Sequence, residues 1–121
     1  MDREIKFRAW DTQDKEMWNW EEHGREICWH LSGECSYDII LMQYTGLKDK
    51  NGVEIYESDI FKHKKNIFMQ VFWSDDKAGW GVKYVLYGSD RGNQNFYKSL
   101  IWASKTCEII GNIHENPELL K

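Results

Sequence analysis

Two histidines and two cysteines lie close together in the first third of the chain, and both residue types bind zinc. They are His23, Cys28, His30 and Cys35, which fall within thirteen residues. A structural zinc site needs four such side chains to converge tetrahedrally. If residues 27–31 form a strand, Cys28 and His30 lie two apart and share one face. The spacing matches no standard zinc knuckle, however, so the sequence favours a core strand with a loop histidine and indicates no metal or cofactor.

A cysteine with a histidine could also form a thiol nucleophile. Such a site needs a general base beside the thiol, an oxyanion donor and a lowered thiol pKa. No local motif supports any of these requirements, and the phosphate loop, the dinucleotide fingerprint and the Gly-x-Ser-x-Gly elbow are absent as well. The sequence therefore predicts no catalytic residues. An enzyme with an unrecognised site stays open as a third hypothesis.

Four carboxylates gather in one short stretch: Asp49, Glu54, Glu57 and Asp59. Paired carboxylates can hold a metal ion or perform acid–base chemistry. A structural role explains them better. Asp49 and Asn51 can build a turn before a glycine, Glu54 alternates outward from its apolar neighbours, and Asp59 can anchor a turn through backbone N–H groups.

A basic run precedes an aromatic-rich segment, and together they form the predicted binding surface: Lys62, Lys64, Lys65, Trp73, Trp80 and Lys83. Small β domains hold single-stranded nucleic acid in basic grooves with stacking aromatic rings. The net charge of −4 opposes affinity for phosphates, however. A protein–protein surface is therefore favoured, and nucleic-acid binding through region 62–105 remains the alternative.

The charge is spread unevenly along the chain. Residues 1–60 carry 7 Lys/Arg and 14 Asp/Glu, a balance of −7, whereas residues 61–105 carry 8 and 3, a balance of +5. Residues 106–121 add 1 and 3, a balance of −2. The asymmetry predicts either two surfaces of opposite sign or, if the charges interleave on folding, an ordinary solvated surface.

Alternation of apolar and polar residues at 5–10 and 53–57, and segments rich in β-forming residues such as 67–73, predict mostly strands. The expected elements are an N-terminal hairpin at 3–20 with a loop at 21–24, a short strand at 27–31, and a strand at 38–44. A hairpin turn is expected at Asn51-Gly52 because both residues tolerate positive φ, followed by a hairpin at 67–87 and a closing strand at 107–114. Gly111 is expected to mark a bulge or a close approach. Segment 96–104 is ambiguous between helix and strand, and Pro117 could begin one helical turn.

Length and composition indicate a single domain spanning 1–121. Seven Trp, six Tyr and five Phe can build a dense core in a short chain. Three cysteines are an odd number, the N-terminus does not resemble a signal peptide, and no stretch is apolar enough to span a membrane. We therefore expect a cytoplasmic protein without disulfides and without a membrane partner.

Three segments, read in order, resemble the YopX family of phage and prophage proteins, found mostly in low-GC Gram-positive bacteria. The signature is LMQYTGLKDKNGVEIYESDI at 41–60, framed by REIKFRAWD at 3–11 and IIGNIHENPELL at 109–120. The family usually has Gly at the position of Ser58, so a turn requiring positive φ would be strained or rebuilt here. The resemblance implies a β-rich fold with an SH3-like barrel element, and it carries no established biochemical activity.

These observations predict a mainly β fold, a small SH3-like barrel or roll with additional hairpins and little helix. The expected function is a phage-encoded, non-catalytic protein-binding module in the cytoplasm of a bacterial host cell. Its partner would be an unknown host or phage protein, and self-association into a homo-oligomer stays open.

Overall fold

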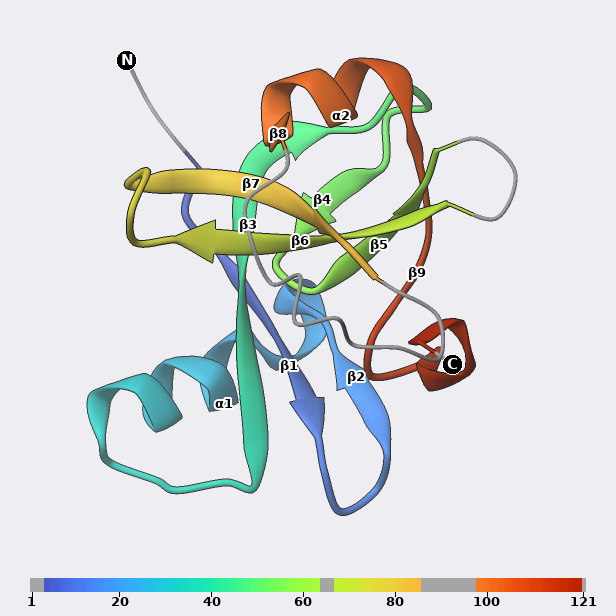
Figure 1. Ribbon diagram of the computed structural model, residues 1–121. Coiled ribbons are helices and arrows are strands. Elements are labelled where there is room, and N and C mark those ends of the chain that lie inside the picture. Colours follow the sequence, from blue (N-terminus) through green and yellow to red (C-terminus); the bar gives the residue numbers. More distant parts are fainter. Residues whose placement is uncertain (1–3, 64–66, 86–97, 121) are drawn as a thin grey trace.

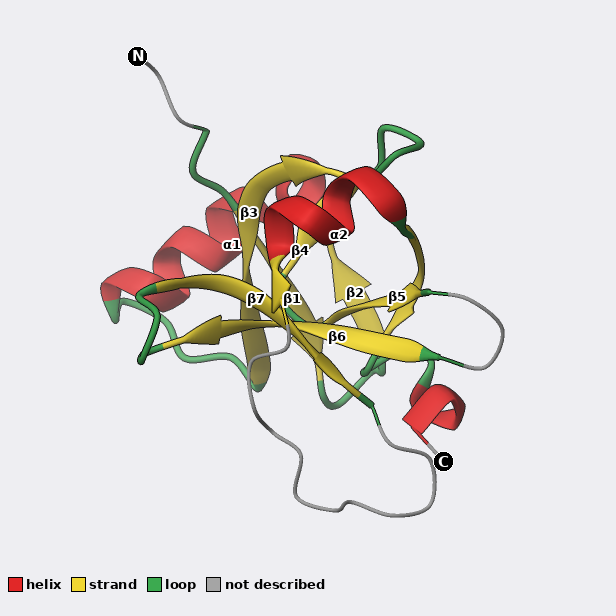
Figure 2. Cartoon of the chain, turned by 45° about the horizontal axis from the view of Figure 1, so that its top comes forward, coloured by secondary structure: helices red, strands yellow, loops and turns green. Residues whose placement is uncertain are grey.

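The computed structural model describes residues 4–63, 67–85 and 98–120, and within them the strands form two curled antiparallel sheets (Figure 1). The first sheet has the order β2 (Glu16–Trp18), β1 (Phe7–Asp11), β3 (Ile39–Lys48) and β4 (Glu54–Tyr56). The second has the order β8 (Lys98–Ser99), β7 (Gly79–Tyr84), β6 (Phe68–Ser74), β5 (Asp59–Lys62) and β9 (Glu108–Asn112). The other elements of the described chain are the helices α1 (Trp20–Ser32) and α2 (Leu100–Thr106) and the 3₁₀ turn η1 (Pro117–Leu120) (Figure 2). The predicted mainly β class is confirmed, and the sheets together form a half-barrel.

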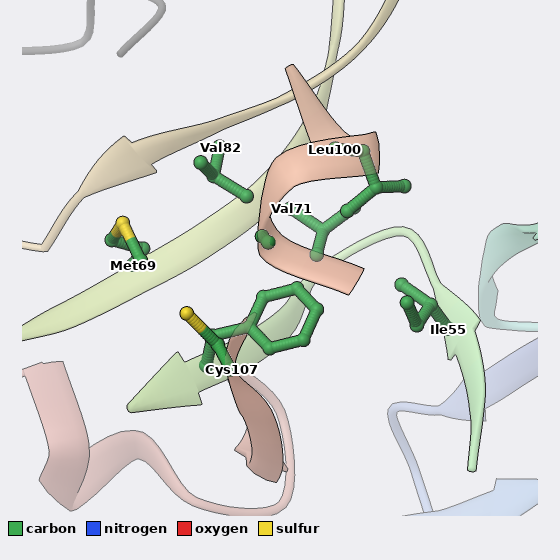
Figure 3. Close-up of a cluster of buried hydrophobic side chains, with 8 residues drawn as sticks. Ile55, Met69, Val71, Val82, Leu100 and Cys107 are labelled. Atoms are coloured by element: carbon green, nitrogen blue, oxygen red, sulfur yellow. The ribbon is translucent and has the colours of Figure 1, made fainter. Parts of the chain in front are cut away.

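The core lies between the second sheet, Ile55 of β4 and helix α2. Helix α2 packs against β7, β8 and β3. Alternate residues of β6 and β7 turn inward, as the period of a half-buried strand requires, so Met69, Val71 and Val82 are fully buried beside Leu100 and Cys107 (Figure 3). No helix in the described ranges is long and apolar enough to cross a membrane.

The local strand patterns are largely confirmed. β1 and β2 pair as the expected N-terminal hairpin, β6 and β7 form the hairpin expected at 67–87, and β9 is the closing strand. The ambiguous segment 96–104 is a two-residue strand, β8, followed by α2. Residues 86–87 and 96–97 of these predictions fall outside the described ranges.

The loop predicted at 21–24 and the strand predicted at 27–31 are wrong, because both belong to helix α1. The helix begins where the side chain of Asn19 accepts a hydrogen bond from the backbone N–H of Glu22 (2.7 Å) and donates one back to its carboxylate. The first bond satisfies one backbone donor at the helix start, and the second, between the two side chains, holds the capping amide in place. The helix ends at Gly33, whose φ of +85° provides the left-handed cap. Its helical period buries only Ile27 completely, so the segment carried too weak an apolar stripe to stand out from a strand.

The hairpin at Asn51-Gly52 is confirmed, but its loop is longer than a two-residue turn. The backbone N–H of Asp49 donates to the carbonyl of Val53 (2.8 Å), and only Gly52 has positive φ, at +86°. The Asp49 carboxylate accepts N–H bonds from Asn51 and Val53 in the loop and from Ile109 in β9 (2.8, 2.9 and 3.0 Å). These bonds lower the pKa of the Asp49 carboxyl against the opposing effect of its burial. The predicted structural role of Asp49 is thus confirmed, and the loop is fixed to the second sheet.

Gly111 lies at a register irregularity between β5 and β9, as predicted. A Cβ atom at this position would collide with the side chain of Asn116. Asn116 uses its side-chain oxygen to accept the backbone N–H of Asn112 (3.1 Å). Glycine therefore allows the segment after β9 to fold back closely against the strand.

The chain passes from the first sheet to the second at a sharp corner, residues 56–59. The N–H of Glu57 donates to Gln43 in the first sheet (3.0 Å), and the next N–H, that of Ser58, donates to Val71 in the second (3.0 Å). Changing sheets within one peptide unit puts Ser58 in the left-handed region, with φ of +77°. The strain expected for a serine at this family glycine position is therefore present.

Replacing Ser58 with glycine should stabilise the protein by about 1 kcal/mol, because glycine adopts this φ without the Cβ clash. Urea unfolding followed by circular dichroism measures the change. Ser58→Ala is the matched control, since it removes the hydroxyl but keeps the Cβ, and it should bring no gain. Equal stability of the glycine variant and the wild type would contradict the strain argument.

Candidate functional site

An ion pair between a partly buried arginine and a buried aspartate holds the corner. The Nη2 of Arg8 in β1 donates to Oδ1 of Asp59 (2.6 Å), and Oδ2 of Asp59 accepts the N–H of Tyr56 (2.7 Å). The guanidinium also lies over the ring of Tyr56, 4.7 Å from its centroid. Asp59 is only 2% exposed, and this burial raises the pKa of its carboxyl while Arg8 opposes the rise. The predicted turn-anchoring role of Asp59 is confirmed.

A second cation, Lys6, lies two residues before Arg8 in the chain and is buried. The Nζ of Lys6 donates to Glu54 in β4 (2.7 Å) and lies 5.0 Å from the ring centroid of Tyr44. The bond to Glu54 raises the pKa of Lys6 above its usual value, and burial raises the pKa of Tyr56 to about 12. Glu54 and Asp59 are therefore each neutralised within the fold.

Beside the corner lies a pocket of about 510 Å³, lined by Gln43 of β3, Glu57 of the corner, Trp73 of β6 and Trp80 of β7. The two indole rings meet edge to face, with centroids 5.2 Å apart and planes at 80°. Trp80 is half-buried against the core, whereas Trp73 is 46% exposed. Glu57 accepts one weak hydrogen bond, from the N–H of Gln43 (3.4 Å), and forms no ion pair with any residue the structure describes.

The structure divides the residues predicted as one binding surface between two faces of the second sheet. Side chains alternate along a strand, and residues paired across strands share a face. Lys62 pairs with Phe68 and Lys83 with Gln70, and the side chains of these even-numbered residues of β6 point to one face. Trp80 pairs with Trp73, an odd-numbered residue of β6 that points to the other face. The lysines and the tryptophans therefore point to opposite sides. The other two predicted residues lie outside the described ranges: Lys64 and Lys65.

The face that carries the two lysines is already engaged in local contacts. The Lys83 ammonium lies 4.9 Å from the ring centroid of Phe72, and burial lowers the pKa of this lysine. Lys62 is exposed and lies directly opposite Glu108 of β9. The cations on this face thus have an aromatic ring and a carboxylate as immediate neighbours.

The four candidate zinc ligands are not brought together. His23 stacks on Trp18 with centroids 4.8 Å apart, and Nδ1 of His30 accepts the N–H of Tyr37 (3.2 Å). Because residues 27–31 are helical, Cys28 and His30 are about 200° apart around α1 and share no face. Cys28 and Cys35 are exposed.

In the described parts of the chain, one group of three potential metal ligands does converge: Asp11, Asp14 and Glu16 in the β1–β2 turn. The Oδ1 of Asp11 already accepts two backbone N–H groups of that turn, from Gln13 and Asp14 (2.9 and 3.2 Å). A turn-building role accounts for the buried member of this group.

One cysteine–histidine pair forms that the sequence did not indicate. The Sγ of Cys107 lies 3.8 Å from Nδ1 of His63, although 44 positions separate them, and 3.3 Å from the hydroxyl of Thr106. The thiol residue is only 1% exposed. A nucleophile must reach its substrate, so this pair acts as a weak hydrogen bond inside the core rather than as an accessible reactive group.

The comparisons with known proteins agree with this fold. A family model described as "YopX protein" matches residues 6–121. A solved structure, the crystal structure of protein EF1440 from Enterococcus faecalis, is similar over 99% of this chain and 100% of its own. The two sequences are 26% identical and the TM-score is 0.59. No curated protein matches the sequence.

The two pocket tryptophans should differ in their contribution to stability. Trp80→Ala removes a ring that packs on the core and should cost about 2–3 kcal/mol of unfolding free energy. Trp73→Ala should cost less than about 1 kcal/mol, because nearly half of its surface is exposed. Chemical denaturation measures both losses of unfolding free energy. Equal losses would show that Trp73 serves to stabilise the fold and is not available to contact a partner.

Stability should also fall as the pH drops below neutral, in part through His114. This ring stacks on Trp10, with centroids 5.8 Å apart, and its burial, together with the charge of Arg8, lowers its pKa. The stability it contributes is present above its unfolded pKa of about 6.5 and is lost as the pH falls through the lower folded value. His114→Phe keeps an aromatic ring against Trp10, so between pH 8 and pH 5 it should lose less stability than the wild type. Parallel pH profiles of thermal unfolding would refute this.

Proposed function

The chain belongs to the YopX family, and we propose that this member is a non-catalytic protein-binding module whose contact surface is the pocket of Gln43, Glu57, Trp73 and Trp80. The observation that carries the proposal is the exposure of Trp73 (46%) at the wall of a pocket whose other aromatic wall, Trp80, is anchored in the core. Tryptophan is enriched at interface hot spots because a large, rigid side chain releases much apolar surface from water on binding.

A non-catalytic role is supported by how the reactive side chains are used. The carboxylates of Asp49 and Asp59 are saturated by backbone N–H groups and by Arg8, and the Cys107 thiol is buried. In the described part of the pocket lining, Glu57 is the one ionisable side chain. A lone carboxylate without a second acid, a base or a nucleophile beside it is suited to binding rather than to turnover.

The finer parts of the proposal come from the sequence resemblance. We expect a phage or prophage gene, action in the cytoplasm of a bacterial host, and a host or phage protein as partner. An SH3-like arrangement of the half-barrel is part of the same expectation. Self-association would make a second copy of this chain the partner, and mass measurement in solution would reveal it.

Nucleic-acid binding remains the second candidate, because Lys62 and Lys83 share a face with Phe72. Two contacts weaken it. Lys83 lies over the Phe72 ring, where a base would have to stack, and Glu108 stands opposite Lys62. A carboxylate at that point reduces the attraction for phosphate.

The proposal predicts that binding depends on Trp73. Immobilised wild type, Trp73→Ala and Trp29→Ala are each exposed to lysate of the cell that carries the gene, and retained proteins are quantified by mass spectrometry. Trp29 is the matched control, because it is similarly exposed (40%) but lies on α1. At least one protein should be retained by the wild type and by Trp29→Ala and be reduced about tenfold or more with Trp73→Ala.

Identical retention by all three proteins would refute the pocket as the contact surface. Titration of labelled single- and double-stranded DNA at two salt concentrations tests the second candidate. Binding that weakens steeply with salt and is abolished by Lys62→Glu would favour nucleic acid over a protein partner.

A further inference from the structure

Resting on the proposed protein-binding function, we propose that the Trp73–Trp80 pocket receives an arginine side chain from an exposed segment of the partner, with Glu57 as its counter-ion. The starting point is charge. Of the carboxylates near the corner, Glu54 is neutralised by Lys6 and Asp59 by Arg8, whereas Glu57 faces the pocket without a cation from the described chain. The pocket therefore offers one unneutralised negative charge.

The two tryptophans add the second requirement for a cation. The face of an indole ring is electron-rich and attracts a cation within about 6 Å of its centroid. Because the ring planes of Trp73 and Trp80 stand at 80°, they form two walls of a corner, and a guest can lie on one face while touching the edge of the other. An apolar guest would gain from the rings alone and would leave the Glu57 carboxylate desolvated.

Hydrogen-bonding geometry favours arginine over lysine. A guanidinium is flat, stacks on an aromatic ring and donates from several N–H groups in a fixed fork, whereas an ammonium is a compact, strongly hydrated charge. The pocket supplies acceptors for such a fork from the Glu57 carboxylate and from the side-chain amide of Gln43, which makes no hydrogen bond with the described residues. The same chain already places the Arg8 guanidinium over the Tyr56 ring and against the Asp59 carboxylate (4.7 and 2.6 Å). The pocket would repeat that combination for an external guest.

Size and surroundings fit a side chain presented on a polypeptide. A volume of about 510 Å³ exceeds what one guanidinium fills, so flanking backbone can enter as well. Residues 1–60, which contribute Gln43 and Glu57, carry a charge balance of −7 (7 Lys/Arg against 14 Asp/Glu). In both views the turn of the β6–β7 hairpin lies on the same side of the molecule as α1, which belongs to that segment (Figures 1 and 2). The negative balance of the segment that supplies Glu57 favours the approach of a basic partner segment.

The test uses a blocked Gly-Arg-Gly peptide as probe, titrated into the ¹⁵N-labelled protein while the indole N–H resonances are followed by NMR. Peptides with lysine or with citrulline, the uncharged isostere of arginine, in the central position are the matched ligands. The arginine peptide should shift the Trp73 and Trp80 indole signals, assigned with Trp73→Phe and Trp80→Phe, and the citrulline peptide should bind at least about tenfold more weakly.

Matched variants locate the charge. Glu57→Gln should weaken the arginine peptide at least about tenfold, whereas Glu34→Gln, an exposed carboxylate after α1, should leave it unchanged. Equal binding of the arginine and citrulline peptides, or binding unaffected by Glu57→Gln, would overturn the inference. If retention of a lysate protein still depends on Trp73 in that case, the proposed function stands and only the arginine guest is refuted. If no retained protein depends on Trp73, the proposed function itself fails.

Discussion

The ion pair between Arg8 and Asp59 is the constraint on which the rest of this structure depends. Burying two charges costs several kcal/mol each, and the attraction between them compensates only when further hydrogen bonds satisfy both groups. Asp59 meets that condition through Arg8 and the N–H of Tyr56. Arg8 meets it less completely, because its Nε is buried without a partner. The pair is therefore better understood as fixing geometry, linking β1 of the first sheet to the first residue of β5 in the second.

That link makes the corner at 56–59 possible, and the corner in turn makes the pocket. Once Asp59 is held, the chain must leave β4 at Tyr56 and enter β5 at Asp59 with only Glu57 and Ser58 between them, and Ser58 takes a left-handed backbone to do so. The side chain immediately before it, Glu57, then lies between the two sheets, where the second sheet presents Trp73. A strained residue beside a binding group is a common arrangement at functional sites. Here the strained residue is Ser58, and the side chain of its neighbour Glu57 lines the pocket.

The acidic signature segment divides into carboxylates with different tasks. Asp49 fastens the β3–β4 loop to β9, Glu54 neutralises Lys6, and Asp59 neutralises Arg8. Each is matched to a donor inside the fold. Glu57 differs, since the hydrogen bond it accepts is long (3.4 Å) and its charge is not balanced by the described chain. The basic residues Lys62 and Lys83 of region 61–105 also do not oppose an acidic pocket, because these lysines and the pocket tryptophans occupy opposite faces of one sheet.

The sequence by itself determined the features that depend on neighbouring residues. Period-2 alternation predicted β1, β-forming residues predicted β6 and β7, Asn51-Gly52 marked the β3–β4 loop, and Gly111 marked a close approach. Helix α1 was missed although its cap, Asn19 with Glu22, was legible, because only one of its residues is fully buried and its apolar stripe is weak.

Tertiary structure alone decided the rest. The proximity of His63 to Cys107, the separation of the lysines from the tryptophans, and the pocket all join residues far apart in the chain. The pocket requires β3, the corner and the β6–β7 hairpin to converge. That convergence is set by the Arg8–Asp59 pair and the sheet change at Ser58, and no local pattern encodes where a chain will meet itself after such a turn.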